Sequence, residues 1–589
     1  MQIETIFHQP YEPYLYINDN HSYIIRLQTK KDDIKKVQVY YGDPFLVSEN
    51  GWKYEKPLKM NKVFSTNLHD FWECVVEPPN NRLKYAFKIS DQSKKLFFGE
   101  TGFCDQLPLF DLSFYFTKPY LHLSDDIHPP KWVKNTIWYQ IFPDRFANGN
   151  QLNDPENTLP WGLDPPKPTS FYGGDIQGVI DQLDYLKELG ITGIYLTPIF
   201  ESPSNHKYDT TNYFRIDSQF GDEWLLKKLI QRCHERGIKV MLDAVFNHTC
   251  QDFPPFQDVL KNGMNSIYKD WFHIHSFPVI SSPVPNYETF SFVSAMPKLN
   301  TENKDVQNFL LSVGAYWLKE CDIDGWRLDV ANEINHSFWR EFRKEMKAIK
   351  NDVYLLGEIW HFALPWVKGD QFDGVMNYPL SHAILSFFAF QNSNSTEFSN
   401  KINQLFSQYP APTLYSLFNL VGSHDTPRIL TQCKQNDQLV ILIYVFLFTF
   451  YGTPCIYYGD EIGLIGGGDP ECRGCMIWNE SDQNKIIYDV VKKLIFLRKK
   501  HLLIANDGQF KWHSVENEPN LIIYERSNEE EVYLIILNRN ENTSSIKLPF
   551  QLLGKKITNI WTNEQFSAES NAIFVDVTPY SYLILHFPI

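Results

Sequence analysis

The chain has 589 residues, with 55 Lys and Arg against 70 Asp and Glu, which gives a formal net charge of −15. Non-specific binding to nucleic acid or to anionic membranes requires basic surfaces, so we expect neither as a partner. A chain of this length exceeds what one hydrophobic core supports, and several domains are therefore expected.

The first residues, MQIETIFHQPYEPYLYIND, contain no basic segment followed by an apolar one. We therefore expect no secretory signal and a cytoplasmic location. The longest apolar run, 439–458, is interrupted by Gly452 and Pro454, which favours a buried helix leading into a strand over a membrane span. Nine cysteines in such a chain favour reduced thiols, and the single C-x-x-C, Cys472 with Cys475, lacks a second ligand pair for zinc, so two packed thiols are expected.

Residues 1–120 consist of short β-branched and aromatic runs separated by turn residues, which predicts an N-terminal β-sandwich. A proline-containing linker follows over 121–134. From 135 to 504, apolar strands alternate with helical stretches, as is typical of a parallel α/β fold. The eight strand candidates are 136–142, 191–198, 238–245, 323–329, 353–359, 372–376, 414–422 and 454–461.

Eight strands with intervening helices favour a (β/α)8 TIM barrel over an open Rossmann sheet. No glycine-rich nucleotide or phosphate motif follows any strand, so no organic cofactor is expected. The connection after the third strand, 249–301, is too long for a simple loop and is expected to form a functional excursion domain. Short strands return over 505–589 and predict a C-terminal β-sandwich.

Acidic residues stand at matched positions where the barrel strands end. Asp243 ends the third strand, Asp329 the fourth and Glu358 the fifth, while Asp425 follows the seventh. One such Asp alone is better explained as a helix cap or a turn residue, but four at matched positions indicate a site at the carboxyl end of the barrel. Converging carboxylates suit cleavage of a glycosidic bond.

The charges near these acids predict different roles for two of them. Arg327 and Asp329 lie two residues apart and project to the same side of a strand, so the guanidinium should lower the pKa of Asp329 and keep this carboxylate anionic as a nucleophile. Glu358 has large apolar neighbours and no adjacent cation in the sequence, so burial should raise its pKa and suit a general acid. This division predicts a retaining hydrolase with carboxyl groups about 5 to 5.5 Å apart.

Four segments taken in order resemble the motifs of the α-amylase superfamily, glycoside hydrolase family 13. They are DAVFNH (243–248), GWRLDVANE (325–333), GEIWH (357–361) and LVGSHD (420–425). A fifth, MPKLN (296–300), resembles the marker of the neopullulanase, cyclomaltodextrinase and maltogenic-amylase subgroup, which also has N-terminal and C-terminal β-domains. The resemblance thus covers nearly the whole chain.

The resemblance implies Asp329 as nucleophile, Glu358 as general acid/base and Asp425 as the carboxylate that supports a distorted sugar. The substrate would be a cyclodextrin, pullulan or short maltodextrin, cleaved at α-1,4 bonds, with α-1,6 cleavage and transglycosylation as further outcomes. Phe362 stands where the subgroup has Asp; catalysis is expected to be unaffected, but the acceptor-side preference of the subgroup does not carry over in detail past Trp360. The residues implied in substrate binding are Tyr208, His248, Phe290, Arg327, Trp360, His424, Asp469 and Arg473.

The loop after the first strand, NGNQLND, is rich in side-chain oxygens. From the residues alone an Asn/Gly turn explains it better than a metal site. The resemblance implies a structural calcium held by this loop together with the YGGD segment. The implied ligands are Asn148, Asn150, Asn153, Asp154, Gly173 and Asp175.

Two other functions fit parts of the sequence. A trehalose- or sucrose-isomerising transferase of the same fold is disfavoured by the MPKLN segment and the N-terminal sandwich. A non-catalytic carbohydrate-binding barrel would be expected to lack an acid or to carry a membrane anchor, and the chain keeps all three acids. The N-terminal sandwich fits either a starch-binding module or a dimerisation arm. The subgroup resemblance favours the second, which implies a homodimer in which this sandwich restricts access to the active site. For the pair of Arg327 and Asp329 the sequence predicts that Arg327→Leu removes most turnover and leaves the fold largely intact.

Overall fold

The computed structural model describes all residues except 20, 164, 514–517, 551 and 568–572. The chain forms two compact units. The first contains residues 1–128 and 394–414, and the second contains residues 129–393 and 415–589. No helix in the described part of the chain is long and apolar enough to cross a membrane.

The first unit is a sandwich of two antiparallel sheets, as predicted. Alternate residues of its strands point inward, and side chains such as Ile25, Val37 and Phe87 are fully buried between the sheets. One sheet has the order β1 (Leu15–Asp19), β2 (Ser22–Lys30), β8 (His69–Val76), β7 (Asn61–Ser65). The other has the order β11 (Gly102–Cys104), β10 (Lys95–Gly99), β9 (Leu83–Ser90), β3 (Lys36–Gly42), β6 (Leu58–Lys59), and β12 (Phe116–Lys118) pairs with β9.

A helix from the middle of the sequence packs on this sandwich. Helix α9 (Ser395–Gln408) begins with a capping box formed by Asn394 and Glu397. Its Asn403 side chain donates to the Ser65 carbonyl at 2.7 Å, and Arg26 donates to the Phe406 carbonyl at 3.2 Å. The helix therefore belongs to the N-terminal unit in space, although it lies within 135–504 in sequence.

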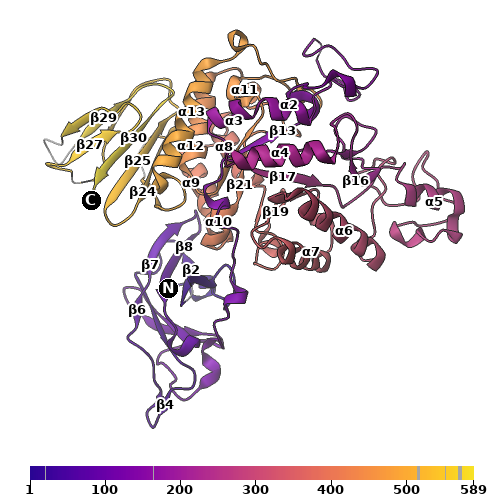
Figure 1. Ribbon diagram of the computed structural model, residues 1–589. Helices are drawn as coiled ribbons and strands as arrows, with labels where there is room; N and C mark the ends of the chain where they lie inside the picture. Colours follow the sequence, from indigo (N-terminus) through magenta and orange to yellow (C-terminus); the bar gives the residue numbers. More distant parts are fainter. Residues whose placement is uncertain (20, 164, 514–517, 551, 568–572) are drawn as a thin grey trace. The chain divides into compact units, whose positions relative to one another are not determined.

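The second unit contains a barrel of eight parallel strands (Figure 1). Hydrogen-bonded neighbours follow the order β20, β19, β18, β17, β14, β13, β22, β21, and a parallel bridge between Met376 and Phe418 closes the circle. The (β/α)8 prediction is confirmed. The strands are β13 (Trp138–Ile141), β14 (Gly193–Leu196), β17 (Lys239–Ala244), β18 (Gly325–Leu328), β19 (Tyr354–Gly357), β20 (Gly374–Val375), β21 (Phe418–Asn419) and β22 (Thr453–Tyr457).

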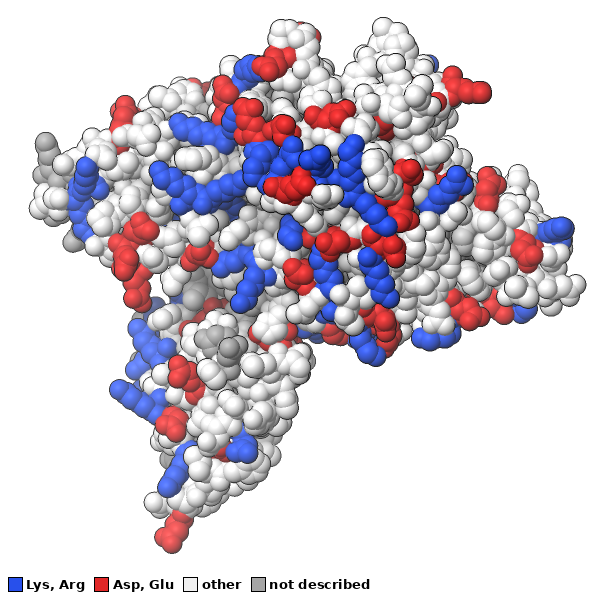
Figure 2. Space-filling model, viewed as in Figure 1, with Lys and Arg blue, Asp and Glu red and all other residues white. Residues whose placement is uncertain are grey.

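Seven of the outer helices begin after an Asn or Asp whose side chain accepts a hydrogen bond from a backbone N–H of the first turn. These N–H groups have no partner within the helix, so the side chain supplies the acceptor that they lack. The helices with such caps are α2 (Ile176–Asp181), α4 (Glu223–Glu235), α6 (Lys304–Cys321), α7 (His336–Ile349), α8 (Tyr378–Phe388), α12 (Asp437–Thr449) and α13 (Lys485–Lys500). Between α2 and α4 lies α3 (Leu183–Leu189). On the face drawn in Figure 2, Lys and Arg side chains are interspersed with Asp and Glu. Within helix α4, Lys227 forms an ion pair with Glu223.

Two apolar segments show where a strand could and could not be told from a helix by sequence. The run 439–458 forms α12, buried from Leu439 to Thr449, followed by β22, as predicted. The predicted seventh strand began too early, because residues 414–416 end helix α10 (Ala411–Ser416) and only Phe418 and Asn419 form β21. Short apolar runs fit a buried helix and a buried strand equally well.

The excursion after β17 extends away from the barrel (Figure 1). It contains helix α5 (Pro254–Asn262) and short turns linked by bridges, with Phe256, Phe272 and Tyr287 in contact at its centre. One bridge, His248 with Lys298, joins the end of the excursion to the segment after β17. The excursion is thereby fixed beside the carboxyl end of the barrel.

The C-terminal strands form the predicted second β-domain. Inward residues such as Ile523, Leu534 and Leu585 make its core. It packs on the barrel through Tyr524, whose hydroxyl bonds Thr449 of α12. The larger sheet has the order β23 (Gln509–His513), β24 (Leu521–Ser527), β25 (Glu531–Asn538), β30 (Ser581–Pro588), β27 (Lys556–Asn559), β28 (Gln565–Ser567), and β26 (Ser544–Lys547) pairs with β29 (Phe574–Val577).

Candidate active site

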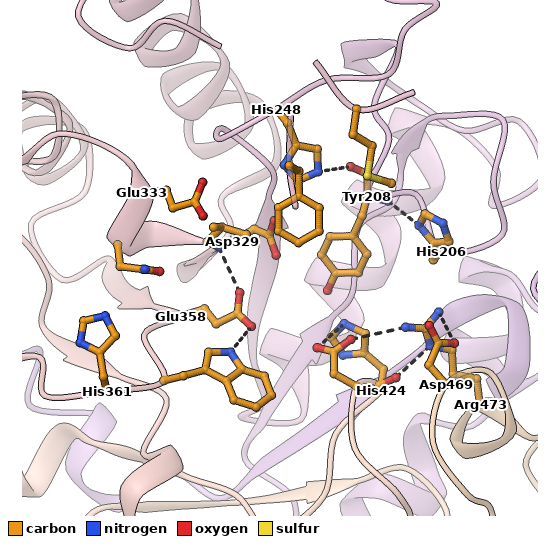
Figure 3. A pocket seen from close by; sticks show the side chains of 16 residues that line it. His206, Tyr208, His248, Asp329, Glu333, Glu358, His361, His424, Asp469 and Arg473 are labelled. Atoms are coloured by element: carbon orange, nitrogen blue, oxygen red, sulfur yellow. Dashed lines mark hydrogen bonds and ion pairs between the residues drawn. The ribbon is translucent and has the colours of Figure 1, made fainter. Parts of the chain in front are cut away.

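A cavity of about 550 Å³ opens at the carboxyl ends of the barrel strands (Figure 3). It contains all three predicted catalytic residues and every predicted substrate-binding residue except Arg327, which lies beneath its floor and is fully buried. Its lining is His206, Tyr208, His248, Phe290, Met296, Asp329, Val330, Asn332, Glu333, Glu358, Trp360, His361, His424, Asp425, Asp469 and Arg473.

The strand register places the acids together. Asp243 in β17 pairs with Arg327 in β18. Asp329 and Glu358 each lie one residue beyond their strand, and their backbone N–H groups still donate to the neighbouring strand, at 3.1 Å to Ala244 and 3.0 Å to Leu328. Because these strands are parallel and adjacent, their carboxyl ends meet at one edge and the side chains converge.

Arg327 is the single cation at the centre of three carboxylates. Its Nη1 lies 3.0 Å from Asp243 Oδ1 and 2.7 Å from Asp329 Oδ1, and its Nη2 forms an ion pair of 2.9 Å with Glu358 Oε2. Glu358 has no adjacent cation in the sequence, but β19 lies next to β18 in the barrel and Arg327 therefore reaches Glu358 from the neighbouring strand. One guanidinium thus fixes the relative position of the two predicted catalytic carboxylates.

The pKa of Asp329 departs from its ordinary value in the direction opposite to that predicted. Burial raises the pKa of Asp329 well above the ordinary range; Arg327 opposes the shift, and the nearby Glu358 and Asp243 add to it. Burial also raises the pKa of Asp243 to about 6. One cation cannot balance three buried carboxylates, so the ligand-free cluster favours bound protons.

Both oxygens of Glu358 have partners. Oε1 accepts a hydrogen bond from Trp360 Nε1 at 2.9 Å, and Oε2 accepts one from the backbone N–H of Val330 at 3.0 Å. The Trp360 ring is half exposed and stacks on Tyr378 with ring centroids 3.8 Å apart. Val330 has φ 43° and ψ 43°, a left-handed conformation that is costly for a β-branched residue, so its N–H is aimed at Glu358 at the expense of backbone strain.

His424 is a neutral donor beside Asp425. Gln140 Nε2 donates to His424 Nδ1 at 2.7 Å, so the ring proton lies on Nε2, which is 3.3 Å from Asp425 Oδ2. Burial, with Arg473 and Arg327 nearby, holds the pKa of His424 well below its usual value. Arg473 reaches Asp425 at 3.4 Å and Asp469 at 2.9 Å.

The other aromatic residues form one wall of the cavity. Tyr208 stacks parallel to His424 at 5.2 Å, and its hydroxyl donates to Asp243 Oδ2 at 2.9 Å. His248 stacks on Phe290 at 4.7 Å and its Nε2 lies 3.0 Å from the Tyr208 carbonyl; burial lowers the pKa of His248 to about 3, so this ring is neutral. Flat rings and neutral imidazoles suit a hydroxyl-rich, uncharged ligand.

Several residues of the cavity were not singled out from the sequence. His206 lies two residues before Tyr208, Met296 lies inside MPKLN and His361 inside GEIWH. Val330, Asn332 and Glu333 lie inside GWRLDVANE, and Glu333 is held by Lys298 Nζ at 2.7 Å. Position inside a motif was the sequence feature that could have indicated most of these residues. Which residues of a motif face the cavity, however, depends on the backbone geometry.

The oxygen-rich loop and the YGGD segment come together in space. Asp154 accepts from Asn148 Nδ2 at 2.9 Å, and Asp175 accepts from the backbone of Gly149 at 3.1 Å and of Gly178 at 2.6 Å. Asn148 Oδ1 and Asn153 Oδ1 are buried and have no partner among the described residues. A Cβ added at Gly173 would collide with Asn148 and Asp154.

Two unpartnered amide oxygens beside two carboxylates are oxygen donors of the kind a hard cation prefers, so the residues present fit calcium. Asn150 fits less well, because its side-chain oxygen already accepts a hydrogen bond from the Leu152 N–H at 3.2 Å.

The cysteines of the C-x-x-C segment, Cys472 and Cys475, form no disulfide. All nine cysteines lie in the described part of the chain and are free thiols, and Cys472 Sγ donates to the His424 carbonyl.

Sequence profiles of known families match the whole arrangement. The "Alpha amylase, catalytic domain" profile matches residues 140–507, "Alpha amylase, N-terminal ig-like domain" matches 1–122, and "Maltogenic Amylase, C-terminal domain" matches 510–584. The chain belongs to the α-amylase family. It is therefore a glycoside hydrolase by family, and the cavity lies where the acids of this barrel meet.

Individual relatives agree over their full lengths. A cyclomaltodextrinase of Geobacillus thermopakistaniensis (strain MAS1) is 50% identical, with 99% of each chain covered. An intracellular maltogenic amylase of Bacillus subtilis (strain 168) is 43% identical and neopullulanase 2 of Thermoactinomyces vulgaris 41% identical, again with 99% of each chain covered. A solved cyclomaltodextrinase structure superposes with a TM-score of 0.95 at 43% identity over all of both chains.

Proposed function

We propose that this α-amylase family member is a retaining hydrolase of α-glucosidic bonds. The observation that supports it is the arrangement of Asp329 and Glu358 on one buried guanidinium, at the floor of a cavity lined by aromatic rings. Retention requires one carboxylate as nucleophile and one carboxylic acid close to it. Arg327 holds both carboxyl groups near each other.

In the proposed reaction Asp329 attacks the anomeric carbon while Glu358 protonates the leaving glycosidic oxygen. The attack needs an ionised Asp329, and the positive charge that develops on the sugar ring favours that ionised form. The second step reverses the role of Glu358, which takes a proton from water as water breaks the glycosyl ester. A sugar hydroxyl in place of water gives transglycosylation by the same route.

Neighbouring side chains would hold the sugar during these steps. His424 Nε2–H and Asp425 lie side by side and offer a donor and an acceptor to adjacent hydroxyls. Tyr208 presents its ring to the cavity, and Arg473 lines the cavity together with its ion-pair partner Asp469. Removal of Asp425 should therefore weaken transition-state binding more than ground-state binding, with kcat reduced more than KM is raised.

The substrate class is proposed from the relatives. Proteins named cyclomaltodextrinase, maltogenic amylase and neopullulanase align along the entire chain, which favours cyclodextrins, pullulan and short maltodextrins, with α-1,4 and some α-1,6 cleavage. Phe362, 45% exposed two residues beyond Trp360, would add an apolar surface for the departing sugar. The transferase and non-catalytic alternatives receive no support from these relatives.

The test is product analysis on β-cyclodextrin, pullulan and soluble starch with the wild-type protein and Asp329→Asn. We expect wild-type hydrolysis with the α-anomer formed first by proton NMR, and a loss of kcat by orders of magnitude in the variant. Turnover of Asp329→Asn near the wild-type rate would remove the proposed mechanism. First formation of the β-anomer would remove retention alone.

We also propose a structural calcium at Asn148, Asn153, Asp154, Gly173 and Asp175. The unpartnered amide oxygens and the space kept by Gly173 support it. The ion would tie the loop after β13 to the start of α2, and no catalytic step is assigned to it.

A cytoplasmic location is proposed because the Bacillus subtilis relative is named intracellular. A homodimer formed through the N-terminal sandwich is proposed from the subgroup resemblance. Sedimentation that yields only monomer at micromolar concentration would contradict the dimer.

A further inference from the structure

A second cavity, of about 640 Å³, lies apart from the catalytic residues. Its walls come mainly from the segment after β13 and from Trp478 in the segment after β22. These two strands are hydrogen-bonded neighbours in the barrel. The second cavity therefore opens at the same end of the barrel as the active site.

Two indole rings in this cavity are fixed in orientation. Trp161 Nε1 donates to the Met476 carbonyl at 3.0 Å, and Trp478 Nε1 donates to the Phe146 carbonyl at 2.7 Å. Trp478 also packs edge-on against Tyr185, with ring centroids 5.3 Å apart. Both indoles are partly exposed, so a ligand would meet rings that lose little conformational freedom on binding.

The polar side chains that line the cavity include Gln151, Gln182 and Thr158, which are uncharged. Asn148 and its partner Asp154 also line it, but they belong to the proposed calcium site and are not needed to bind a ligand here. No Lys, Arg or His occurs among the described residues that line it. This composition disfavours phosphates and other anions, which need cations or free N–H groups.

The ligand that matches these walls is uncharged, carries many hydroxyl groups and has flat apolar faces. A glucosyl chain has these properties, since its C–H faces stack on aromatic rings and its hydroxyls pair with amides and carboxylates. The volume lies within the range of small-molecule sites and accommodates a short oligosaccharide.

We propose that this cavity is a second, non-catalytic binding site for α-glucan chains, which goes beyond the proposed hydrolysis. One short segment joins it to the active site, because Arg473 lines one cavity and Trp478 the other. Five peptide units span at most about 18 Å. Arg145 fixes that segment by donating to the Arg473 carbonyl at 2.7 Å and accepting from the Met476 N–H at 2.8 Å.

A glucan held at the second cavity would raise the local concentration of chain ends at the active site. The benefit applies to long chains that reach both cavities. Short substrates that fill only the active site would gain nothing from it.

The first test is calorimetric titration of Asp329→Asn with maltoheptaose. We expect two sites per chain, and Trp161→Ala added to Asp329→Asn should weaken one of them about tenfold or more while the other is unchanged. Trp161→Phe keeps a ring and should retain most of the binding. Trp224→Ala is the matched control, since Trp224 is 67% exposed on α4 and lines neither cavity.

The second test uses the active enzyme. Trp161→Ala should leave kcat and KM for maltotriose unchanged and raise KM for soluble starch several-fold. If Trp161→Ala fails to fold, Gln151→Ala, at an exposed position, should weaken the second site by up to about tenfold. One site per chain, or a titration unaffected by these substitutions, overturns the proposal, whereas activity of Asp329→Asn would bear only on the hydrolytic mechanism.

Discussion

Removal of the positive charge beneath the active site should destabilise the protein as well as inactivate it. Arg327→Leu leaves Asp243, Asp329 and Glu358 buried with no cation among them. Loss of one partner from a buried ion pair costs about 3 to 5 kcal/mol, and here one guanidinium serves three carboxylates. The expectation from the sequence alone, of a largely intact fold, becomes one of a folded but markedly less stable protein.

The loss should depend on pH with a definite sign. The pKa of Asp243 is raised to about 6 in the fold, so its contribution to stability is fully present below the ordinary Asp pKa and is lost as pH rises through about 6. Arg327 lowers the pKa values of Asp243 and Asp329 in the folded protein, so its removal should raise both further. Each additional proton kept by the folded state changes the free energy of unfolding by about 1.4 kcal/mol per pH unit, so Arg327→Leu should lose more stability at pH 8 than at pH 5.

The assay is urea unfolding followed by tryptophan fluorescence at pH 5 and pH 8, with activity on β-cyclodextrin measured in parallel. Arg340→Leu is a matched control, because Arg340 forms an exposed pair with Asp370 and should cost at most about 1 kcal/mol. An Arg327→Leu midpoint equal to the wild-type value at pH 8, or a deficit independent of pH, would refute the reasoning.

Three further outcomes are expected. A chelator should lower the melting temperature of the wild type and have no effect on that of Gly173→Ala. Gly162→Ala is the control and should keep the response, because Gly162 has a similar positive φ but a Cβ added there would meet no atom nearer than 4.0 Å. An unshifted wild-type transition counts against the cation. Cys472 should resist alkylation at pH 8 because burial raises the pKa of its thiol to about 11, and rapid modification detected by mass spectrometry would contradict this. Trp360→Phe removes one hydrogen bond to Glu358 and should change kcat on maltotriose by less than about tenfold, whereas Glu358→Gln should reduce it by about a hundredfold or more; equal effects of the two would be inconsistent with the roles proposed.

The barrel and the position of its acids could be predicted because both depend on local patterns. Parallel strands of one barrel end at a common edge. Acidic residues at the ends of successive apolar runs are therefore predicted to bring their side chains together, as Asp243, Asp329 and Glu358 do. The start of the seventh strand could not be predicted, since the apolar residues before Phe418 suit a buried helix equally well.

The electrostatics of the site could not be predicted from neighbours in sequence. The sequence predicted the contact of Arg327 with Asp329, but adjacent strands also bring Asp243 and Glu358 to the same guanidinium. Burial then outweighs the single cation and reverses the expected direction for the pKa of Asp329. The bond from Trp360 to Glu358 depends on a side-chain rotamer, which sequence spacing does not determine.

Among the described residues with a left-handed backbone, Val330 is the only β-branched one. A search for stabilising substitutions would be drawn to it, because Gly or Asn adopts this conformation more readily. The same substitution would loosen the one backbone N–H that fixes Glu358 Oε2. Engineering for heat resistance should therefore leave this position unchanged and look for gains in parts of the chain that substrate never reaches.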